Sequence, residues 1–250
     1  MEIEPAGIFR EIIVLEKTAS TNDFARELAG AGAASGLAVF AEQQSAGRGR
    51  FGRQWDSASG LGLWFSLVLR PEMPRELWTR LPTWAAVGVA GVLAENGFEP
   101  AIKWPNDIFV CEKKVAGILV ESAEDRDGKP FAIIGVGLNV NHEQFDGDLA
   151  RTATSLRICG GRVVDRQQLA QSLLKNLSEL YPALAENFDW LLREAELRSN
   201  LIGRPIKTSV DGSVLDGVAE ALDSDGALLL RATDGRLVRL CSGEVTILPF

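Results

Sequence analysis

A glycine- and arginine-rich run, Gly47 to Arg53, holds the most closely spaced chemical groups of the chain. Arg48, Arg50 and Arg53 each stand beside a glycine, which lets the backbone fold closely around a ligand. The forked guanidinium group suits the oxygens of phosphates and carboxylates. Because charges of one sign so close together repel each other until an anion neutralises them, we expect a disordered loop that becomes ordered on an anionic ligand.

The same run also fits other kinds of site. Its spacing Gly47-x-Gly49-x-x-Gly52 matches a dinucleotide-binding fingerprint, but that fingerprint must open a helix, and the residues from Trp55 to Gly60 favour turns that lead into a strand. A protein-kinase loop would require HRD and DFG sequences, which the chain lacks. A solvated basic loop and an RNA-contacting patch stay open as interpretations of the run alone.

Three further segments combine polar groups or small residues with predicted strands. Lys103 to Asp107 (KWPND) follows a strand, where α/β proteins commonly place ligand contacts, and its proline holds the preceding residue in extended geometry. Lys114 lies at a predicted hairpin end and is followed by small residues. In Gly135-x-Gly137-x-Asn139, glycine within a strand indicates close approach by a ligand. Each segment also has a structural interpretation: a core tryptophan, a solvated lysine, or glycines that let strands pack.

Strands and helices must together position these segments. The residues Ser20 to Asp23 can cap a helix, because apolar residues at helical spacing follow them. The Gly/Arg run joins two buried strands. Strands are predicted over 11–15, 37–41, 61–69, 101–103, 108–110, 115–121 and 131–140, with a hairpin turn at 112–114, and helices over 77–95, 169–180 and 188–197.

After Gly203 the chain changes to short runs of β-forming residues separated by Asp-Gly pairs. The pairs lie at 211–212, 216–217, 225–226 and 234–235. Such pairs favour tight hairpins, because both central residues of these turns need positive φ. About five short strands predict a small barrel, with a domain boundary near residues 200 to 204.

Bulk composition excludes several classes of protein. The 250 residues are 46% apolar with a net charge of -8, so we expect a globular core, and any site for a polyanion must be local. Cys111, Cys159 and Cys241 form no CxxC pair, which argues against a disulfide framework or a zinc knuckle. A lone histidine, His142, excludes a two-histidine metal site. Without a leader-like N-terminus or about 18 consecutive apolar residues, we expect a soluble, cytoplasmic protein.

Taken in order, these segments resemble the bacterial biotin-protein ligases. The matching set is Ser20-Thr21-Asn22, Gln44, the Gly/Arg run through Trp55, Lys103 to Asp107, Lys114 to Gly117, and Gly135 to Asn139. Gly226 to Leu230 and Ser242 to Glu244 also look like the small end domain of that family. The resemblance implies an α+β fold, with a mixed sheet flanked by helices over residues 1–201 and a small SH3-like β-barrel over 202–250.

The resemblance also implies a two-step reaction. The carboxylate of biotin attacks the α-phosphate of ATP, which yields biotinyl-5′-AMP and pyrophosphate. A lysine of a biotin carboxyl carrier protein then takes the biotinyl group as an amide. Biotin and ATP would be the substrates, and Mg²⁺ would shield the triphosphate.

Roles for individual residues follow from the same resemblance. The biotin pocket would comprise Ser20, Thr21, Asn22, Gln44, Gly47, Arg48, Gly117, Gly135 and Gly137. The ATP and adenylate site would comprise Arg48, Arg50, Arg53, Trp55, Lys103, Asn106, Asp107, Lys114 and Asn139. Lys114, Lys103 and Arg50 would be catalytic, since cations can stabilise charge that develops on the carboxylate and phosphate oxygens. Trp55 would pack near adenine and exclude water, and Asp107 is a candidate base for the acceptor lysine.

One departure and two rival functions complete the expectations. Some family members carry a helix-turn-helix region before the catalytic domain, whereas only nineteen residues precede Ser20, so we expect no DNA binding. A homodimer is expected from the family alone. The nearest enzymatic rival is a lipoate or octanoate ligase, and the rival of another class is a non-catalytic biotin- or RNA-binding module.

Overall fold

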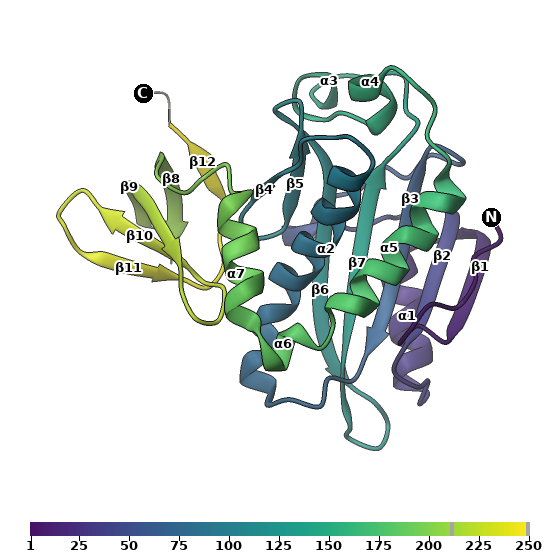
Figure 1. The fold of residues 1–250 in the computed structure, drawn as a ribbon. Coiled ribbons are helices and arrows are strands. Elements are labelled where there is room, and N and C mark those ends of the chain that lie inside the picture. The colour runs from purple at the N-terminus through teal and green to yellow at the C-terminus, as the bar shows by residue number, and fades with distance from the viewer. Residues whose placement is uncertain (211–212, 249–250) are drawn as a thin grey trace.

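A seven-stranded mixed sheet forms the larger part of the computed structural model, which describes residues 1–210 and 213–248 (Figure 1). The strand order is β1-β2-β3-β7-β6-β5-β4, with β1 and β2 parallel and the other neighbours antiparallel. The strands are β1 (Glu11–Thr18), β2 (Leu37–Gln44), β3 (Gly62–Leu69), β4 (Ala101–Lys103), β5 (Asp107–Val110), β6 (Lys113–Glu124) and β7 (Pro130–Asn139).

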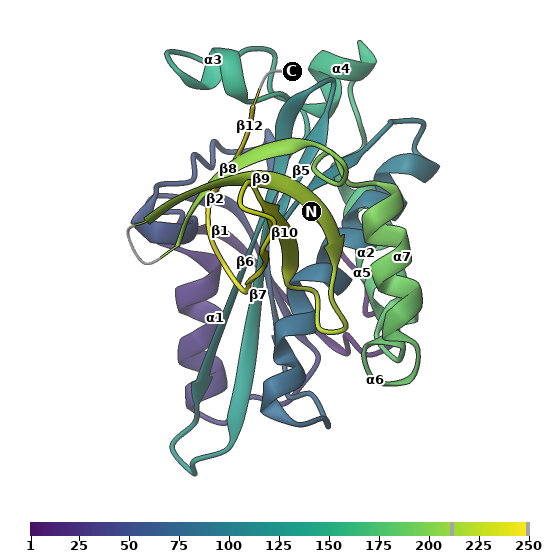
Figure 2. The ribbon, with the colours of Figure 1, turned by 90° about the vertical axis from the view of Figure 1, so that its left-hand side faces the viewer.

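Helices cover both faces of this sheet. Figure 2 shows α1 on one side and α2, α5 and α7 on the other. Ser20 is the N-cap of α1, as its position before the apolar residues predicts. The helices are α1 (Thr21–Gly30), α2 (Leu81–Glu95), α3 (Leu149–Thr152), α4 (Leu156–Gly160), α5 (Arg166–Leu180), α6 (Ala183–Glu186) and α7 (Phe188–Leu197), with 3-10 turns η1 (Arg50–Gly52) and η2 (Arg75–Arg80).

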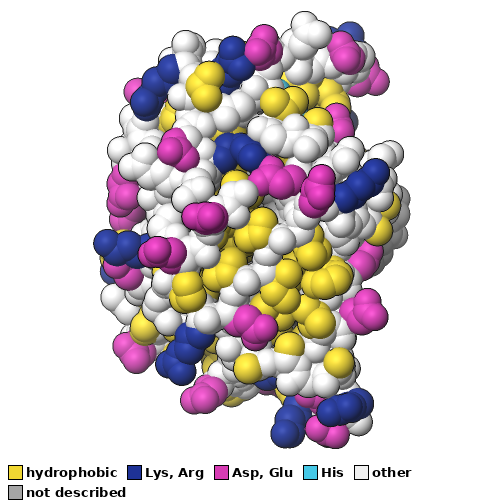
Figure 3. All heavy atoms as spheres, turned by 90° about the vertical axis from the view of Figure 1, so that its right-hand side faces the viewer, with side chains coloured by type: hydrophobic (Ala, Val, Ile, Leu, Met, Phe, Trp, Pro, Cys, Tyr) yellow, Lys and Arg dark blue, Asp and Glu magenta, His cyan; other side chains and the backbone are white. Residues whose placement is uncertain are grey.

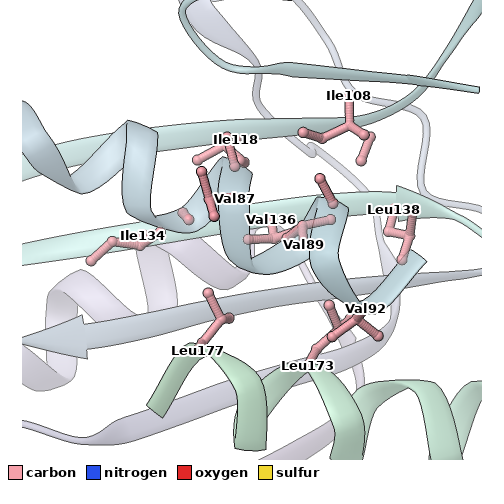
Figure 4. Packing of buried hydrophobic residues seen from close by; sticks show 14 of the residues in the cluster. Val87, Val89, Val92, Ile108, Ile118, Ile134, Val136, Leu138, Leu173 and Leu177 are labelled. Atoms are coloured by element: carbon pink, nitrogen blue, oxygen red, sulfur yellow. The ribbon is translucent and has the colours of Figure 1, made fainter. Parts of the chain in front are cut away.

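The main core lies between the sheet and α2. This helix is apolar around most of its circumference, because it is covered by the sheet on one side and by α5 and α7 on the other. Figure 4 shows valines of α2 between sheet residues above and α5 leucines below. The labelled members are Val87, Val89, Val92, Ile108, Ile118, Ile134, Val136, Leu138, Leu173 and Leu177.

A five-stranded antiparallel sheet follows α7 and lies beside the β4–β5 edge of the larger sheet (Figure 1). Its order is β11-β10-β9-β8-β12, and the described residues pair as an open sheet without closing a barrel. Trp104 belongs to its apolar core, and the indole N–H of Trp104 donates to the carbonyl of Gly226 at 2.9 Å. The strands are β8 (Pro205–Val210), β9 (Ser213–Leu222), β10 (Leu228–Ala232), β11 (Leu237–Leu240) and β12 (Val245–Ile247).

Several predicted turns differ from the structure. The β5–β6 hairpin turns at Cys111 and Glu112, both at positive φ, so Lys114 lies within β6 and not in the turn. Asp216-Gly217 lies inside β9, where a side chain at Gly217 would meet the carbonyl oxygen of Arg231 at 2.3 Å. The pairs at 225–226 and 234–235 do separate strands, whereas 211–212 lies outside the described residues. The short helices α3 and α4 were not predicted.

The outer edge of the large sheet is formed by β1, which is apolar from Ile12 to Leu15 and charged at Glu11, Glu16 and Lys17. Val14 is exposed, and Ile12, Ile13 and Leu15 are half-buried. Figure 3 shows hydrophobic side chains gathered on the face of the molecule that carries this edge, with charged side chains around them. Within the described part of the chain, no helix is long and apolar enough to cross a membrane.

Candidate functional site

A cavity of about 680 Å³ opens at one end of the large sheet. Its walls come from the start of α1, the Gly/Arg run, the β4–β5 turn, β6, β7, α3 and the start of β12. The site residues predicted from the sequence line this cavity with one exception: they are Ser20, Thr21, Asn22, Gln44, Arg48, Arg50, Arg53, Trp55, Lys103, Asn106, Asp107, Lys114, Gly117, Gly135, Gly137 and Asn139. Gly47 is absent from the lining and lies behind it, against the carbonyl of Trp55.

One end of the cavity, called the neutral end, carries a chain of hydrogen bonds among uncharged side chains, and the nearby Arg48 is paired with Asp23 and Glu121. Gln44 at the end of β2 accepts from the backbone N–H of Thr21 at 2.8 Å and donates from Nε2 to the hydroxyl of Ser57 at 2.8 Å. The fully buried Ser66 of β3 lies 2.8 Å from the Thr21 hydroxyl and 2.6 Å from Asn22 Oδ1. The start of α1 is thereby held against β2 and β3, with uncharged polar groups facing the cavity.

Glycines in β6 and β7 let side chains approach the floor of the cavity. A Cβ at Gly135 would lie 2.1 Å from Asn22 Oδ1. A Cβ at Gly137 would lie 2.5 Å from the indole of Trp55, and one at Gly117 would lie 2.9 Å from the same ring. Trp55 therefore rests on the glycines predicted to contact biotin, and its expected contact with adenine stays a prediction. Its buried indole N–H has no hydrogen-bond partner among the described residues.

The other end of the cavity is cationic. The Lys114 ammonium lies 2.7 Å from Asp107 Oδ1 and 5.2 Å from the centre of the Trp55 ring. Lys103, at the end of β4, is half-buried, and burial lowers the pKa of its ammonium although the Asp107 charge opposes this. Burial likewise lowers the pKa of Arg50. Cations kept partly out of water interact strongly with an anion that enters beside them.

The three arginines of the Gly/Arg run do not converge on one point. Arg48 pairs with Glu121 at 2.9 Å and with Asp23 at 2.6 Å, and these contacts, led by the hydrogen bonds to Glu121, raise its pKa. Arg50 donates to Asn106 Oδ1 at 2.9 Å. Arg53 pairs with Glu244 just before β12. Each arginine thus ties the run to a different part of the molecule, and the idea that the run is disordered without ligand stays a prediction.

Several site residues were not predicted from the sequence. Ser66 is the one polar side chain in the apolar strand Gly62–Leu69, which was an available signal. Ser57, Glu121 and Phe145 gave no comparable signal, because their importance depends on contacts with distant segments. Residues 149–153 and 243–246 also line the cavity. No group of three His, Cys, Asp or Glu side chains that could hold a metal occurs among the residues described.

Comparison with known proteins gives two family matches. Residues 14–141 match the model of the biotin/lipoate A/B protein ligase family, and residues 201–248 match the biotin protein ligase C-terminal domain. The chain belongs to the biotin protein ligases. Both matched segments contribute to the cavity, because the first carries the hydrogen-bonded and cationic ends and the second supplies residues 243–246.

Individual ligases resemble this one over nearly the whole chain. The bifunctional ligase/repressor BirA of Bacillus spizizenii is 36% identical over 95% of this chain and 74% of its own. The biotin--[acetyl-CoA-carboxylase] ligase of Paracoccus denitrificans is 33% identical over 90% of this chain and 96% of its own. The structure of the Aquifex aeolicus biotin protein ligase in complex with biotin and ATP has a TM-score of 0.83 and 30% identity, and the match covers 96% of this chain and 99% of that one.

Proposed function

We propose that this ligase activates biotin with ATP to biotinyl-5′-AMP and transfers the biotinyl group to a lysine of a biotin carboxyl carrier protein. The observation that carries the proposal is the division of one cavity into a neutral, hydrogen-bonding end and a cationic end. An acyl adenylate needs both, since its acyl part is uncharged and its phosphate is anionic. The Paracoccus relative is named as a ligase of this kind, and the Aquifex relative binds biotin and ATP.

The neutral end would hold the ureido ring and the acyl chain of biotin. Thr21 and Gln44 present hydroxyl and amide groups, and the glycines at 117, 135 and 137 leave backbone open on the cavity floor. A pocket of this kind is otherwise apolar, with few polar groups to orient its ligand. Trp55 would lie along the acyl chain and keep water away from the reactive anhydride.

The cationic end would hold the phosphates of ATP. Lys114 lies between Asp107 and Trp55, which suits it to stabilise charge on the α-phosphate oxygens as the biotin carboxylate attacks. Lys103 and Arg50 would face the remaining phosphates. Arg53 would reach the ligand by exchanging Glu244 for a phosphate oxygen. Asn106 and Asn139 would orient the nucleotide, and Asp107 is the candidate base for the acceptor lysine.

Mg²⁺ would enter as part of the MgATP substrate. The carboxylates that line the cavity include Asp107 and Glu244, and both already pair with cations of the protein. A substrate-borne ion that keeps several of its water ligands fits such a site, because Mg²⁺ commonly binds through one or two carboxylates plus phosphates.

Four further expectations stand as proposals. The domain division at residues 201 and 202 agrees with the separate sheet that begins at Pro205. A homodimer has a candidate surface at the outer edge of β1, where Ile12 to Leu15 are apolar and the backbone could pair with a second copy. A cytoplasmic location fits a chain with free cysteines. We also expect that the protein does not bind DNA, and a gel-shift titration with duplex DNA would test this.

The direct test of the function is incubation with biotin, MgATP and a carboxyl carrier domain, followed by mass spectrometry of the carrier. We expect one biotinyl group on one lysine, with both biotin and ATP required. The same incubation with lipoate in place of biotin distinguishes a biotin ligase from its enzymatic rival, a lipoate ligase. A carrier that stays unmodified with biotin but gains a lipoyl group would contradict the proposal, and no modification with either acid would favour a binding module.

A further inference from the structure

The Gly/Arg run folds as a small hairpin over residues 48–54, called here the Gly/Arg hairpin. Arg48 and Gln54 pair across its base as an antiparallel bridge. Just outside the base, the backbone N–H of Trp55 donates to the carbonyl of Gly47 at 2.8 Å. The position of Trp55 on the floor of the cavity therefore depends on how firmly the base of the hairpin is held.

Three arginine side chains hold the Gly/Arg hairpin to the rest of the molecule. Among the residues that the structure describes, they make all of its hydrogen bonds and ion pairs with other segments. Arg50, near the tip, donates to one side-chain amide and one backbone carbonyl, and Arg53 has a single ion pair that is exposed on both sides. Neither contact fixes the tip strongly, so the base is the place where the hairpin can be held.

Arg48, at that base, is held by two carboxylates. Its guanidinium makes two parallel contacts with Glu121, from Nη1 to Oε1 at 3.1 Å and from Nη2 to Oε2 at 2.9 Å, and Nη2 also lies 2.6 Å from Asp23 Oδ1. A bidentate pair of this kind is stronger and more fixed in direction than a single contact. Because Glu121 belongs to β6 and Asp23 to α1, Arg48 joins the hairpin to the sheet and to a helix at once.

The charges around Arg48 are already balanced. Arg26 of α1 also pairs with Glu121, at 2.9 Å, so two guanidinium groups face two carboxylates. An anionic ligand at Arg48 would have to displace Glu121, whose side chain is only 19% exposed and would lose its main partner. At Arg50 the same ligand would displace an uncharged amide, and at Arg53 an exposed carboxylate. The geometry therefore favours Arg50 and Arg53 as ligands of an anion and gives Arg48 a different task.

We propose that Arg48 is a positioning residue, which fastens the base of the Gly/Arg hairpin and so holds Trp55 and the two other arginines over the cavity without touching the ligand. The inference rests on the proposed function, in which Trp55 lies along biotin and Arg50 and Arg53 face the phosphates. An anchor and a direct ligand predict opposite results when Glu121 is changed. Loss of Glu121 would release an anchor, whereas it would free a direct ligand from a competing carboxylate.

The first test is a double-variant cycle of Arg48→Gln and Glu121→Gln in the full chain, measured by pyrophosphate exchange. We expect each single variant to raise the KM values for biotin and MgATP together by about 5- to 30-fold, and the double variant to be no worse than the singles, because both remove the same contact. Since Glu121 also bonds to Asn22 at the neutral end, the KM for MgATP is the deciding value.

Three outcomes of this cycle would overturn the inference. A direct ligand would raise the KM for MgATP in Arg48→Gln and leave it unchanged or lower in Glu121→Gln. Independent roles would give effects that add in the double variant. A variant that merely folds less well would lose kcat at an unchanged KM.

The second test needs no catalysis, so it separates failure of the anchor from failure of the proposed function. Trypsin cuts after arginine, and mass spectrometry of the fragments gives the rate of cleavage after Arg50 and Arg53. We expect Arg48→Gln and Glu121→Gln to be cut there several-fold faster than the parent, because a released hairpin opens more often. Equal rates in the parent and in Arg48→Gln would contradict the anchor.

Arg26→Gln is the matched control for both tests. Arg26 pairs with the same carboxylate and is 38% exposed against 37% for Arg48, but it lies on α1 and not on the hairpin. We expect parent-like KM values and parent-like cleavage, and losses equal to those of Arg48→Gln would overturn the inference. Slow cleavage of a parent chain that shows no pyrophosphate exchange, with fast cleavage of Arg48→Gln, would refute the proposed function and leave the anchor in place.

Discussion

The two ends of the cavity are built in different ways. At the neutral end the polar side chains are buried, with Ser66 fully so and Asn22 4% exposed, and their hydrogen bonds run within the protein. At the cationic end the side chains stand further in solvent, with Arg53 68% and Lys114 32% exposed, and each pairs with a carboxylate. The hydrogen bonds of the neutral end are therefore complete within the protein, whereas under the proposed function the cationic end would exchange its protein partners for phosphate.

This difference assigns separate tasks to the two ends. A buried network with fixed donors and acceptors discriminates between ligands, because a wrong ligand leaves buried polar groups unpaired. Exposed ion pairs discriminate little but supply charge where it develops in the reaction. Changes at the neutral end should therefore alter affinity for biotin, and changes at the cationic end should alter the rate.

The largest expected effect is at Lys114. Lys114→Ala removes the ammonium beside Asp107, and we expect kcat for adenylate formation to fall by about 10² to 10³ while the KM for biotin changes little. Quenched-flow measurement of biotinyl-5′-AMP would show this. Lys113→Ala is the matched control, because its ammonium donates to the carbonyl of Ala150 outside the ion-pair cluster. If Lys114→Ala forms biotinyl-5′-AMP as fast as the parent does, Lys114 has no role in the reaction.

The neutral end should respond next most strongly, to Gly135→Ala. The added methyl group would lie 2.1 Å from Asn22 Oδ1, so the hydrogen-bond chain must shift. Overpacking of this kind costs about 1 to 3 kcal/mol, and a loss of that size in binding corresponds to a rise of roughly 5- to 150-fold in the Kd for biotin. Calorimetric titration would measure it. Gly30→Ala is the control, since a methyl group there meets nothing within 4 Å; similar affinities for both variants would contradict a preformed network.

Much of the cavity could be predicted from local sequence, and part of it could not. Ser20 capping α1, the strand at Gly62–Leu69 and the Lys103–Asp107 turn are local features that propensity and pattern determine. The link from Glu121 through Asn22 to Ser66 joins three distant elements, and no local pattern encodes it. The pairing of each loop arginine with a carboxylate or amide on another element could likewise not be predicted from the local sequence.

A smaller effect concerns stability and comes from His142. Burial lowers the pKa of this imidazole, partly offset by the Asp56 charge. Below about pH 6.5 the unfolded chain takes up a proton that the folded chain resists, so the free energy of unfolding should fall as the pH decreases from there. Urea titrations at several pH values would measure the slope of the free energy of unfolding against pH. His142→Phe keeps the stacking on Phe145, whose ring centre lies 4.9 Å away, and should flatten that slope; an unaltered slope would exclude His142 as its source.

The smallest effect is expected at Arg53. Its ion pair with Glu244 is exposed on both sides, so Arg53→Ala should change the free energy of unfolding by less than about 1 kcal/mol. Arg53 should nevertheless contribute to nucleotide binding, which would appear as a several-fold rise in the KM for MgATP without any change in the KM for biotin. Arg151→Ala, which removes an exposed pair with Asp148, provides the comparison for stability. A larger loss of stability than in that variant would show that the Gly/Arg run is part of the folded core.

The most direct test of the divided cavity is the exchange of labelled pyrophosphate into ATP, because it follows the first half-reaction without the carrier. With biotin and MgATP present, we expect rapid exchange, and with lipoate in place of biotin we expect none. Under the proposed function, the neutral end would account for that selectivity and the cationic end for the exchange itself. Exchange supported by lipoate and not by biotin would contradict the assignment of the neutral end to the urea of biotin.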